Sequence, residues 1–512
     1  MKIMRKFKKL IKHIENPEIP IVYYIMFFFF VVTIRNFWEM FIYGSPILLV
    51  FHWHYTIGYT TLALALIIIL HYAVRSKIKK ILRVVLSGFI FIFLAPIFDY
   101  IITRPDYYIE KYYIGYLEPG FAGNMWHRFF TFFGPYADRA AATPGVRIEI
   151  FIILVAFFIY IFIKKKSWIR SLIFTLITYA VIFAFFALPY FVKGFLKIFD
   201  LFYEYSNALM VNFLLLLFLI LASIVFYLYS KKYFITILKD IRILRLIHFE
   251  LMFFVGALLA LMNVPDTMIL ELNQDSVFHW IFFVIAIACA CIFSLITNNI
   301  TDYNLDKINS PERPLTSSKI SIKHYRIMAA IFFILASIYS LSVHFIFFMM
   351  IFMFMGFYFI YSMPPLRLKI IPILSKFLIA VNSLILIMMG FLYVSGDATI
   401  PPKIVIFTLL GFTAVINFID IKDYKGDKAH GIKTLPTILG LKKSKILIAI
   451  FMLLTYLASF FVLKSLYLFI VFTFIGFLQV YFITSSNYKE KPVFITYIVS
   501  ILVFIIYTYL NL

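Results

Sequence analysis

Charged side chains are scarce in this 512-residue chain: only 14% of the residues are Asp, Glu, Lys or Arg, whereas 64% are hydrophobic. A soluble globular protein is typically about a quarter charged and about half apolar. The composition excludes a soluble protein with a buried core, because too little polar sequence remains to cover one. Long apolar runs recur along the whole chain, and about 20 such residues cross a bilayer as a helix. The runs are continuous rather than alternating, which argues against a transmembrane β-barrel.

Cysteine and acidic residues are also few. Cys289 and Cys291 are the two cysteines, and two residues apart on a helix they face different sides, so we expect no disulfide framework. The 24 Asp and Glu are outnumbered by 47 Lys and Arg, which gives a net charge of +23. In a soluble protein this excess suggests nucleic acid. Here the basic residues lie between apolar runs and orient the protein in the membrane, so we expect no nucleic-acid partner.

Fifteen apolar runs are long enough to span a bilayer, which predicts an all-α, polytopic helical membrane protein with about 15 transmembrane helices. Six runs lie at residues 20–43, 51–74, 81–102, 146–163, 171–193 and 206–229. Nine follow at residues 244–264, 277–299, 324–342, 344–361, 373–395, 403–421, 443–463, 465–484 and 493–511. A basic connector at 230–245 separates the sets. It predicts an N-terminal membrane domain of about six helices over residues 1–235 and a second domain over 240–512.

The basic residues predict the orientation of the chain through the positive-inside rule. With a cytosolic N-terminus, every cytosolic connection contains Lys or Arg, whereas the outside connections 44–50, 198–205 and 265–276 contain none. The long connection 103–145 is mixed in charge. We therefore expect a multi-pass protein of the cell membrane with its N-terminus in the cytosol and its C-terminus outside.

An amide and two carboxylates stand at regular spacing where the eighth span reaches the cytosol. Asn298, Asp302 and Asp306 occupy positions i, i+4 and i+8. On a helix this spacing puts them on one face, about 12 Å from end to end. Oxygen ligands of this kind suit Mg²⁺, which is normally shared with substrate phosphates.

A second acidic cluster closes the twelfth span on the same predicted side. Asp420, Asp423 and Asp427 stand at i, i+3 and i+7, again on one helical face. Two such clusters predict two metal sites that face one anionic ligand. The cations available to contact that ligand are Arg313, Lys369, Lys422 and Lys433. A diphosphate fits this description, and an apolar tail on the ligand would explain why the site lies in a membrane.

Three stretches resemble the UbiA superfamily of intramembrane prenyltransferases. "NNITDYNLDKINSPERPL", from Asn298, is similar to its first Asp-rich motif, N-x-x-x-D-x-x-x-D, and "DYKGDKAHGIKTLP", from Asp423, is similar to its second, D-x-x-x-D. "YSMPPLRLK", from Tyr361, is similar to the segment after the fourth helix of the family domain. The resemblance covers about 240–512 and implies a C-terminal nine-helix UbiA-like bundle. It does not cover the first half.

The resemblance implies a Mg²⁺-dependent transfer of a polyprenyl group from a polyprenyl diphosphate to a lipophilic acceptor, with release of diphosphate. Metal and cations would neutralise the charge that grows on the leaving group, and an apolar tunnel would exclude water. The implied metal ligands are Asn298, Asp302 and Asp306 for one ion, and Asp423 and Asp427 for the other. The implied catalytic residues are these four aspartates and Tyr361, and the implied diphosphate-binding residues are Arg313, Lys369 and Lys433.

Two positions depart from the family pattern or add to it. Asn299 stands where the family often has Asp, and it points away from the ligand face. Asp420 is additional, and we expect it to orient Lys422 or a metal-bound water. The stretch "DKINSPERPLTSSKIS" is nearer to members with chlorophyllide-like or glycerol-phosphate acceptors than to those with hydroxybenzoate, which does not identify the acceptor.

A multi-pass transporter that uses the acidic clusters to bind cations or anionic lipids is the alternative function. Transporters place ionisable groups near the midplane on broken helices, whereas these carboxylates gather at one membrane face. A CDP-alcohol phosphotransferase would need D-G and A-R in its first cluster, and "DYNLDKINSPER" contains neither.

Several polar residues lie within the apolar runs or begin them. Glu250 is a functional candidate because intramembrane carboxylates are costly; it either lines the acceptor pocket or lies near the interface. Asn382 and Asn417 are predicted to form hydrogen bonds between helices. Thr143 and Pro144 predict a capped helix start after the 103–145 connection.

Overall fold

The computed structural model describes residues 2–43, 49–103, 125–133, 142–264, 273–396, 399–429 and 431–511. Within these ranges the secondary structure is helical and no strand occurs. Fourteen helices are long and apolar enough to cross a membrane, and one bent helix pair raises the number to as many as fifteen. The predicted all-α, polytopic fold is confirmed. Most of the 103–145 connection lies outside the described residues, apart from the helix α7 (Met125–Thr131).

The chain forms two compact units. The first is Met1–Phe234 with Asn273–Phe278, and the second is Ile235–Leu272 with His279–Leu512. Residues 273–278 belong to the first unit although they begin α14 (Gln274–Thr301), whose remainder belongs to the second. The apolar pattern of the sequence did not indicate this division, because the boundary between the units falls within α14, which is one continuous apolar helix.

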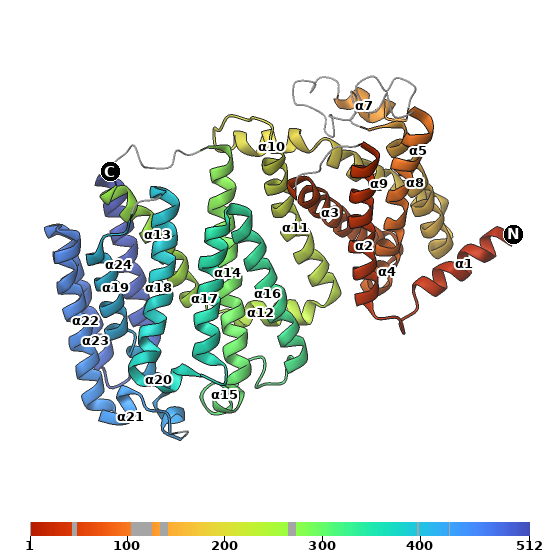
Figure 1. Ribbon diagram of the computed structural model, residues 1–512. Helices are drawn as coiled ribbons and strands as arrows, with labels where there is room; N and C mark the ends of the chain where they lie inside the picture. The colour runs from red at the N-terminus through yellow and green to blue at the C-terminus, as the bar shows by residue number, and fades with distance from the viewer. Residues whose placement is uncertain are drawn as a thin grey trace. The chain divides into compact units, whose positions relative to one another are not determined.

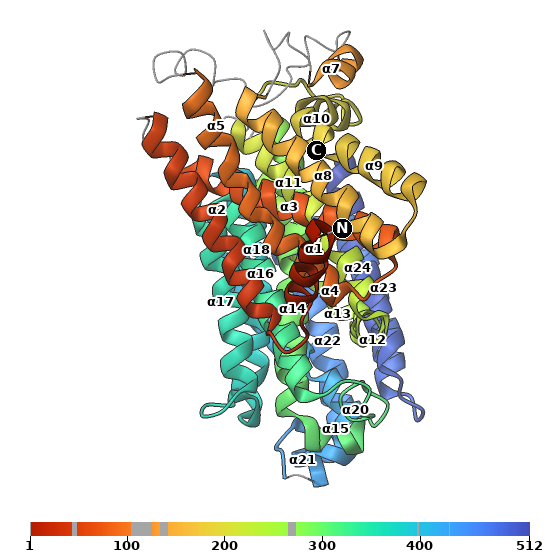
Figure 2. The same ribbon diagram turned by 90° about the vertical axis from the view of Figure 1, so that its right-hand side faces the viewer.

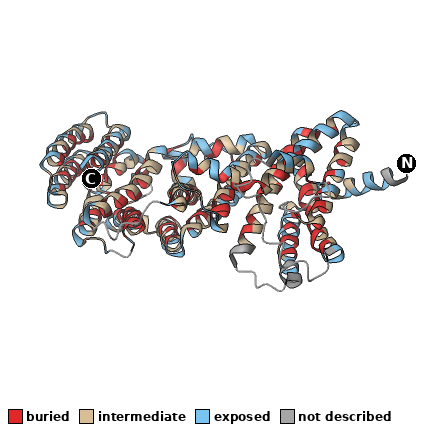
Figure 3. Ribbon diagram, turned by 90° about the horizontal axis from the view of Figure 1, so that it is seen from above, coloured by how far each residue is buried: buried red, intermediate tan, exposed pale blue. Residues whose placement is uncertain are grey.

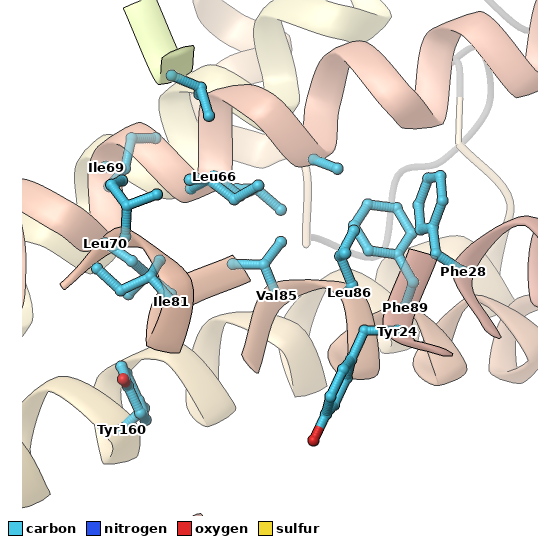
Figure 4. Close-up of a cluster of buried hydrophobic side chains, with 14 of the residues drawn as sticks. Tyr24, Phe28, Leu66, Ile69, Leu70, Ile81, Val85, Leu86, Phe89 and Tyr160 are labelled. Carbon is cyan, nitrogen blue, oxygen red and sulfur yellow. The ribbon is translucent and has the colours of Figure 1, made fainter. Parts of the chain in front are cut away.

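The helices of the first unit pack around an aromatic and aliphatic core (Figure 4). Phe28 and Phe89 meet edge to face there, with ring centroids 4.8 Å apart. The described helices of this unit besides α7 are α1 (Lys2–Ile14), α2 (Ile21–Tyr43), α3 (Leu49–Val74), α4 (Ile78–Gly88), η1 (Phe89–Phe93), α5 (Leu94–Thr103), α8 (Pro144–Lys165), α9 (Trp168–Phe186), α10 (Leu188–Lys197) and α11 (Asn207–Tyr229). The helix α12 (Lys231–Asp240) carries the chain into the second unit.

The start of α8 follows the predicted capping chemistry. Thr143 accepts a hydrogen bond from the Val146 amide, and Pro144 occupies the first turn. Asp99 on α5 binds the same helix start by accepting hydrogen bonds from the Thr143 hydroxyl and the Gly145 amide. The predicted cap is therefore confirmed, and α5 holds it in place.

The expected span 171–193 is interrupted in the structure. Helix α9 ends at Phe186, and the short helix α10 begins at Leu188 with a proline in its first turn. A proline has no amide hydrogen and clashes with the preceding turn of a helix. The predicted span is therefore present at Trp168–Phe186, but it ends before residue 193, and the prediction counted the apolar run without the break before Pro189.

The second unit contains nine spanning segments within its described residues. These are α13 (Ile243–Asn263), α14, α16 (Ile322–Val343), α17 (Phe345–Ser362), α18 (Pro372–Ser395), the pair α19 (Pro402–Val415) and α20 (Phe418–Ala429), α22 (Leu441–Leu463), α23 (Leu466–Thr484) and α24 (Glu490–Asn511). Shorter helices are α15 (Tyr303–Asn309), η5 (Leu368–Ile370) and α21 (Leu435–Leu439).

Two glycines let α13 and α18 approach each other closely. A Cβ added to Gly256 would lie 1.9 Å from the Ile387 carbonyl oxygen, and one added to Gly390 would lie 1.9 Å from that of Phe253. Small residues commonly permit such close packing between membrane helices. Among the spans of the described residues, α18 is the most buried, with 72% of its apolar stretch buried.

The twelfth span is bent rather than straight. Helices α19 and α20 meet at an angle of 43°. At the break, the Asn417 side-chain amide donates to the carbonyl oxygens of Thr413 and Ala414 in its own helix, and the Asp420 amide bonds to Asn417 with i−3 spacing. A side chain inserted into the helical hydrogen-bond ladder is a recognised cause of a kink. The prediction that Asn417 bonds to another helix was therefore wrong.

Each unit has buried residues in its interior and exposed apolar residues on its outside (Figure 3). Phe461 is 77% exposed and Leu410 is 68% exposed. Such apolar surface is unsuited to water and suits the hydrocarbon of a bilayer. Within the second unit, α15, α20 and α21 lie at the same end of the bundle (Figures 1 and 2).

Candidate active site

The first acidic cluster lies where α14 passes into α15. Asn298 is in the last turns of α14, Asp302 stands between the two helices and Asp306 lies in α15. The Asp302 amide bonds to the Asn298 carbonyl at 2.9 Å, and the Asp306 amide bonds to the Asp302 carbonyl at 2.8 Å. These i−4 bonds carry helical spacing across the junction. Asp302 and Asp306 are buried, and the Asn298 side-chain oxygen accepts a hydrogen bond from Ser362.

Three cations neutralise the carboxylates of this cluster. Asp302 forms an ion pair with Lys369, and Arg367 lies 3.4 Å from the same carboxylate oxygen. Asp306 forms an ion pair with Arg313. Arg313 and Lys369 were predicted to contact diphosphate, and that contact stays a prediction; in the structure they pair with the carboxylates of the first cluster. Arg367 was not predicted.

The second cluster lies along α20. The Asp420 carboxylate accepts a hydrogen bond from the Lys376 ammonium on α18 at 2.5 Å, and both side chains are 10% exposed. Lys422 instead lies 3.4 Å from Glu490. Asp420 therefore does not orient Lys422, because α18 supplies a buried ammonium nearer to it. Sequence reasoning missed Lys376 because it looked for cations only in the connecting segments.

Tyr361 connects the two clusters in space. It lies in the last turn of α17, where its hydroxyl is within electrostatic range of Lys376, Asp420 and Asp302. Asp427 is within range of both Lys376 and Lys369. Helices α15 and α20 also contact each other directly. The structure therefore brings the two predicted clusters together at one end of the second unit.

The carboxylates of the site are destabilised as anions. Burial raises the pKa of Asp306, and it lowers the pKa of the Lys369 ammonium. These directions describe a site in which acids repel one another and additional positive charge would be stabilising.

The oxygen donors of the site suit a hard divalent cation. Among the described residues, no three His, Cys, Asp or Glu side chains are arranged to hold a metal ion together. The donors are carboxylates and an amide, the types that Mg²⁺ prefers. One buried oxygen of Asp420 has no hydrogen-bond partner. The donor chemistry therefore fits Mg²⁺, with Lys369, Lys376 and Arg313 as the present partners of the carboxylates.

A buried network behind the first cluster was not predicted. Asn299 donates to Asp240 at 3.0 Å and to the Tyr325 hydroxyl at 3.4 Å, and its side-chain oxygen accepts from Arg242 at 3.1 Å. That oxygen also lies 3.5 Å from the Arg313 guanidinium. Asn299 was dismissed because it faces away from the ligand, but it reaches the site through Arg313. The sequence did carry one signal for this network, because Asn299 is a second amide directly beside Asn298.

Two other predicted residues lie in different settings. Lys433 is exposed between α20 and α21, and within the described ranges it forms no ion pair, so its predicted contact with diphosphate stays a prediction. Asn382 is buried on α18, and its side-chain oxygen has no hydrogen-bond partner, contrary to the expected bond between helices. Cys289 and Cys291 are free thiols, as predicted.

Comparisons with known proteins agree with the motifs. The UbiA prenyltransferase family matches residues 249–501. The digeranylgeranylglyceryl phosphate synthase of Pyrococcus furiosus is 31% identical over 220 residues, which are 41% of this chain and 70% of that protein. The synthase of the same name from Thermococcus gammatolerans is 29% identical over 214 residues, 41% of this chain and 71% of that protein.

Among solved structures, a UbiA homolog from Archaeoglobus fulgidus bound to DMAPP and Mg²⁺ is 17% identical, with a TM-score of 0.43. The match covers 54% of this chain and 98% of that chain. The family match over residues 249–501 agrees with the relatives from Pyrococcus and Thermococcus. The chain therefore belongs to the UbiA prenyltransferase family and is a multi-pass membrane prenyltransferase.

Proposed function

We propose that the second unit transfers a polyprenyl group from a polyprenyl diphosphate to a hydroxyl of a lipid acceptor and releases diphosphate. The observation that carries this proposal is the meeting of two acidic clusters and their cations around Tyr361 at one end of the second unit. A diphosphate needs this combination of oxygen ligands for its metal and cations for its own charge.

The cations of the site exchange partners when diphosphate binds. Lys369 and Arg313 now neutralise Asp302 and Asp306, and both are close enough to the cluster to turn toward an anionic ligand. As the allylic C–O bond breaks, negative charge grows on the diphosphate, and these ammonium and guanidinium groups stabilise it. Lys376 stays bound to Asp420 and keeps a buried positive charge beside Tyr361.

The metal ligands in this proposal are Asn298, Asp302 and Asp306 for one Mg²⁺, and Asp423 and Asp427 for the other. When bound, Mg²⁺ supplies Lewis-acid stabilisation to the leaving diphosphate. The raised pKa of Asp306 supports this part of the proposal, because burial disfavours its anionic form and a divalent cation would stabilise that form.

Aromatic side chains lie beside Tyr361. The Tyr358 ring lies 6.1 Å from that of Tyr361, and Phe249 and Phe354 pack against Tyr358. Such walls exclude water, which would otherwise capture the allylic cation. They also suit an isoprenoid chain, so the tail of the donor extends along them.

The relatives suggest the substrates. Their name, digeranylgeranylglyceryl phosphate synthase, describes a glyceryl phosphate with two geranylgeranyl groups. For this chain we therefore propose geranylgeranyl diphosphate as the donor and geranylgeranylglyceryl phosphate as the acceptor. The stretch from Asp306 is similar to members with chlorophyllide-like or glycerol-phosphate acceptors, so this choice of acceptor depends on the relatives and not on that stretch.

The topology and the first unit complete the proposal. By the distribution of Lys and Arg, the acidic clusters face the cytosol, with the N-terminus on the same side and the C-terminus outside. The chemistry belongs to the domain at 240–512, and no chemical role is assigned to the domain at 1–235.

The test uses the full-length protein in liposomes with Mg²⁺, labelled geranylgeranyl diphosphate and geranylgeranylglyceryl phosphate. We expect a doubly prenylated product from the wild type, and a loss of at least a hundredfold in Asp302→Ala and Asp423→Ala. Glu312→Gln is the matched control, because this exposed carboxylate lies in the same segment outside the cluster. Equal product from all four proteins would refute the site.

A further inference from the structure

The interior of the second unit contains a carboxylate that the acidic clusters do not use. Glu250 lies in the second turn of α13, within a membrane span. Both of its carboxylate oxygens are buried, and neither has a hydrogen-bond partner in the described structure. Leaving a buried carboxylate unpaired is costly, so such a group is expected to have a ligand or a function.

The neighbouring ionisable group on the same helix is fully used in packing. His248 contacts the Tyr497 hydroxyl through Nδ1 at 2.8 Å and the Ser383 hydroxyl through Nε2 at 3.1 Å. It therefore joins α13 to α24 and α18 and has no ring nitrogen left for a ligand. Glu250, two residues further along, has no such structural bond, so packing does not explain it.

The position of Glu250 along α13 and its neighbours on α14 indicate its depth. Along α13 it lies five residues inward from Arg245, whose charge acts on Asp423 and Tyr361; five residues are about 7 Å of helix. On α14 it is within electrostatic range of Cys291, which precedes Asn298 by seven residues, or about 10 Å. Cys291 is in turn within range of Tyr358, the ring that packs on Tyr361.

This depth matches the place of an attacking oxygen. A diphosphate at the acidic clusters has its allylic carbon one P–O–C linkage inward, and the nucleophile must come within about 3–3.5 Å of that carbon. The nucleophile is therefore needed about one to two helical turns inward, which is about 5–11 Å. Glu250 lies in this interval, whereas the cluster carboxylates lie at the diphosphate itself.

A second buried acceptor lies at nearly the same level. The bond between His248 and Ser383 sets α13 and α18 in register, and Asn382, the residue before Ser383, has a side-chain oxygen without a partner. A buried oxygen acceptor without a partner complements a ligand that brings a hydroxyl donor. A glyceryl hydroxyl is such a donor, whereas an isoprenoid chain is not.

We propose that Glu250 binds the attacking hydroxyl of the lipid acceptor and accepts its proton during transfer. The bond between the allylic carbon and the diphosphate oxygen breaks, and its electron pair leaves with diphosphate. A lone pair of the acceptor oxygen forms the new C–O bond, and the hydroxyl proton moves to the Glu250 carboxylate. This inference rests on the proposed function, because it requires an acceptor that reacts through a hydroxyl.

The test compares the wild type with Glu250→Gln and Glu250→Asp in liposomes. It measures binding of geranylgeranyl diphosphate with Mg²⁺, and transfer to geranylgeranylglyceryl phosphate. We expect Glu250→Gln to bind the diphosphate with an affinity within threefold of wild type but to lose transfer by about 10²–10⁴-fold, the usual contribution of a general base. Glu250→Asp should recover part of the transfer because it restores a carboxylate.

The outcomes separate the two proposals. Transfer by Glu250→Gln at the wild-type rate would overturn the role of Glu250 and leave the proposed function intact. Loss of diphosphate binding in the same variant would also overturn it, because the residue would then support the bundle or the diphosphate site. Absence of transfer in the wild type, with diphosphate binding retained, would instead refute the proposed acceptor.

Discussion

Replacing Lys376 with methionine should strongly destabilise the second unit. The Lys376 ammonium lies 2.5 Å from the Asp420 carboxylate, and both side chains are 10% exposed. Removing the cation leaves a buried carboxylate without its counter-charge, which typically costs about 3–5 kcal/mol of unfolding free energy. Replacing both residues with apolar ones of similar size removes the stranded charge as well, so Lys376→Met with Asp420→Leu should recover most of that loss.

A matched control exists on α20, two residues after Asp420. Lys422 also pairs with a carboxylate, at 3.4 Å from Glu490, but its side chain is 54% exposed. Exposed ion pairs contribute only about 0–1 kcal/mol, so Lys422→Met should change stability little. Glu490 also keeps Arg245 as a partner, at 3.5 Å.

The assay is unfolding of the purified protein followed by a dye that becomes fluorescent on reacting with thiols. Cys289 and Cys291 are free and lie inside the second unit, so their exposure reports the loss of its structure. We expect Lys376→Met to unfold well before the wild type, and Lys422→Met to unfold with it. The reasoning is refuted if Lys376→Met unfolds with the control, or if the double variant is less stable than Lys376→Met alone.

Three further predictions follow from the site and the packing. Removal of divalent cations with EDTA should abolish transfer. Mg²⁺ affinity should fall as the pH drops, because burial raises the pKa of Asp306 and protons then compete with the metal for its carboxylate; equal Mg²⁺ affinity at pH 5 and pH 8 would contradict this. Asn299→Asp replaces the amide donor that lies 3.0 Å from Asp240 with a second carboxylate. We therefore expect Arg313, which lies beside Asn299, to shift and KM for the diphosphate to rise at least tenfold. An unchanged KM would show that this network does not position Arg313. Gly256→Ala places a Cβ 1.9 Å from the Ile387 carbonyl oxygen and should lower the unfolding midpoint. The control is Gly356→Ala, whose Cβ would meet no atom within 4 Å and should leave the midpoint unchanged. Equal midpoints for the two variants would refute the close packing of α13 and α18.

The acidic clusters show how far spacing alone can locate a site. Asn298, Asp302 and Asp306 keep helical spacing because their local backbone bonds continue through the junction of α14 and α15. Local hydrogen bonds depend on neighbouring residues, so the sequence pattern was sufficient to predict the shared face. The partner of Asp420 could not be predicted in this way, because Lys376 is 44 residues distant and only the packing of α18 against α20 brings it near.

The bend in the twelfth span shows a second limit of sequence patterns. The apolar run 403–421 was predicted as one span, yet the Asn417 side chain bonds to the preceding turn of the chain and α20 turns by 43°. An asparagine in a span can bond within its helix or across to another, and the choice depends on which groups surround it. Composition cannot supply that information, because surroundings are set by helices far away in the chain.

The amino-acid sequence by itself determined that this chain is helical, crosses a membrane many times and carries two acidic motifs at matching helix ends. Those properties depend on apolar length and local spacing, which each segment carries alone. Tertiary structure decided that Tyr361 lies between the motifs, that Lys376 and Asn299 belong to the surroundings of the site, and that Glu250 remains unpaired inside the bundle. These relations arise only when distant helices pack, because a buried charge or amide takes its partner from whichever helix lies beside it.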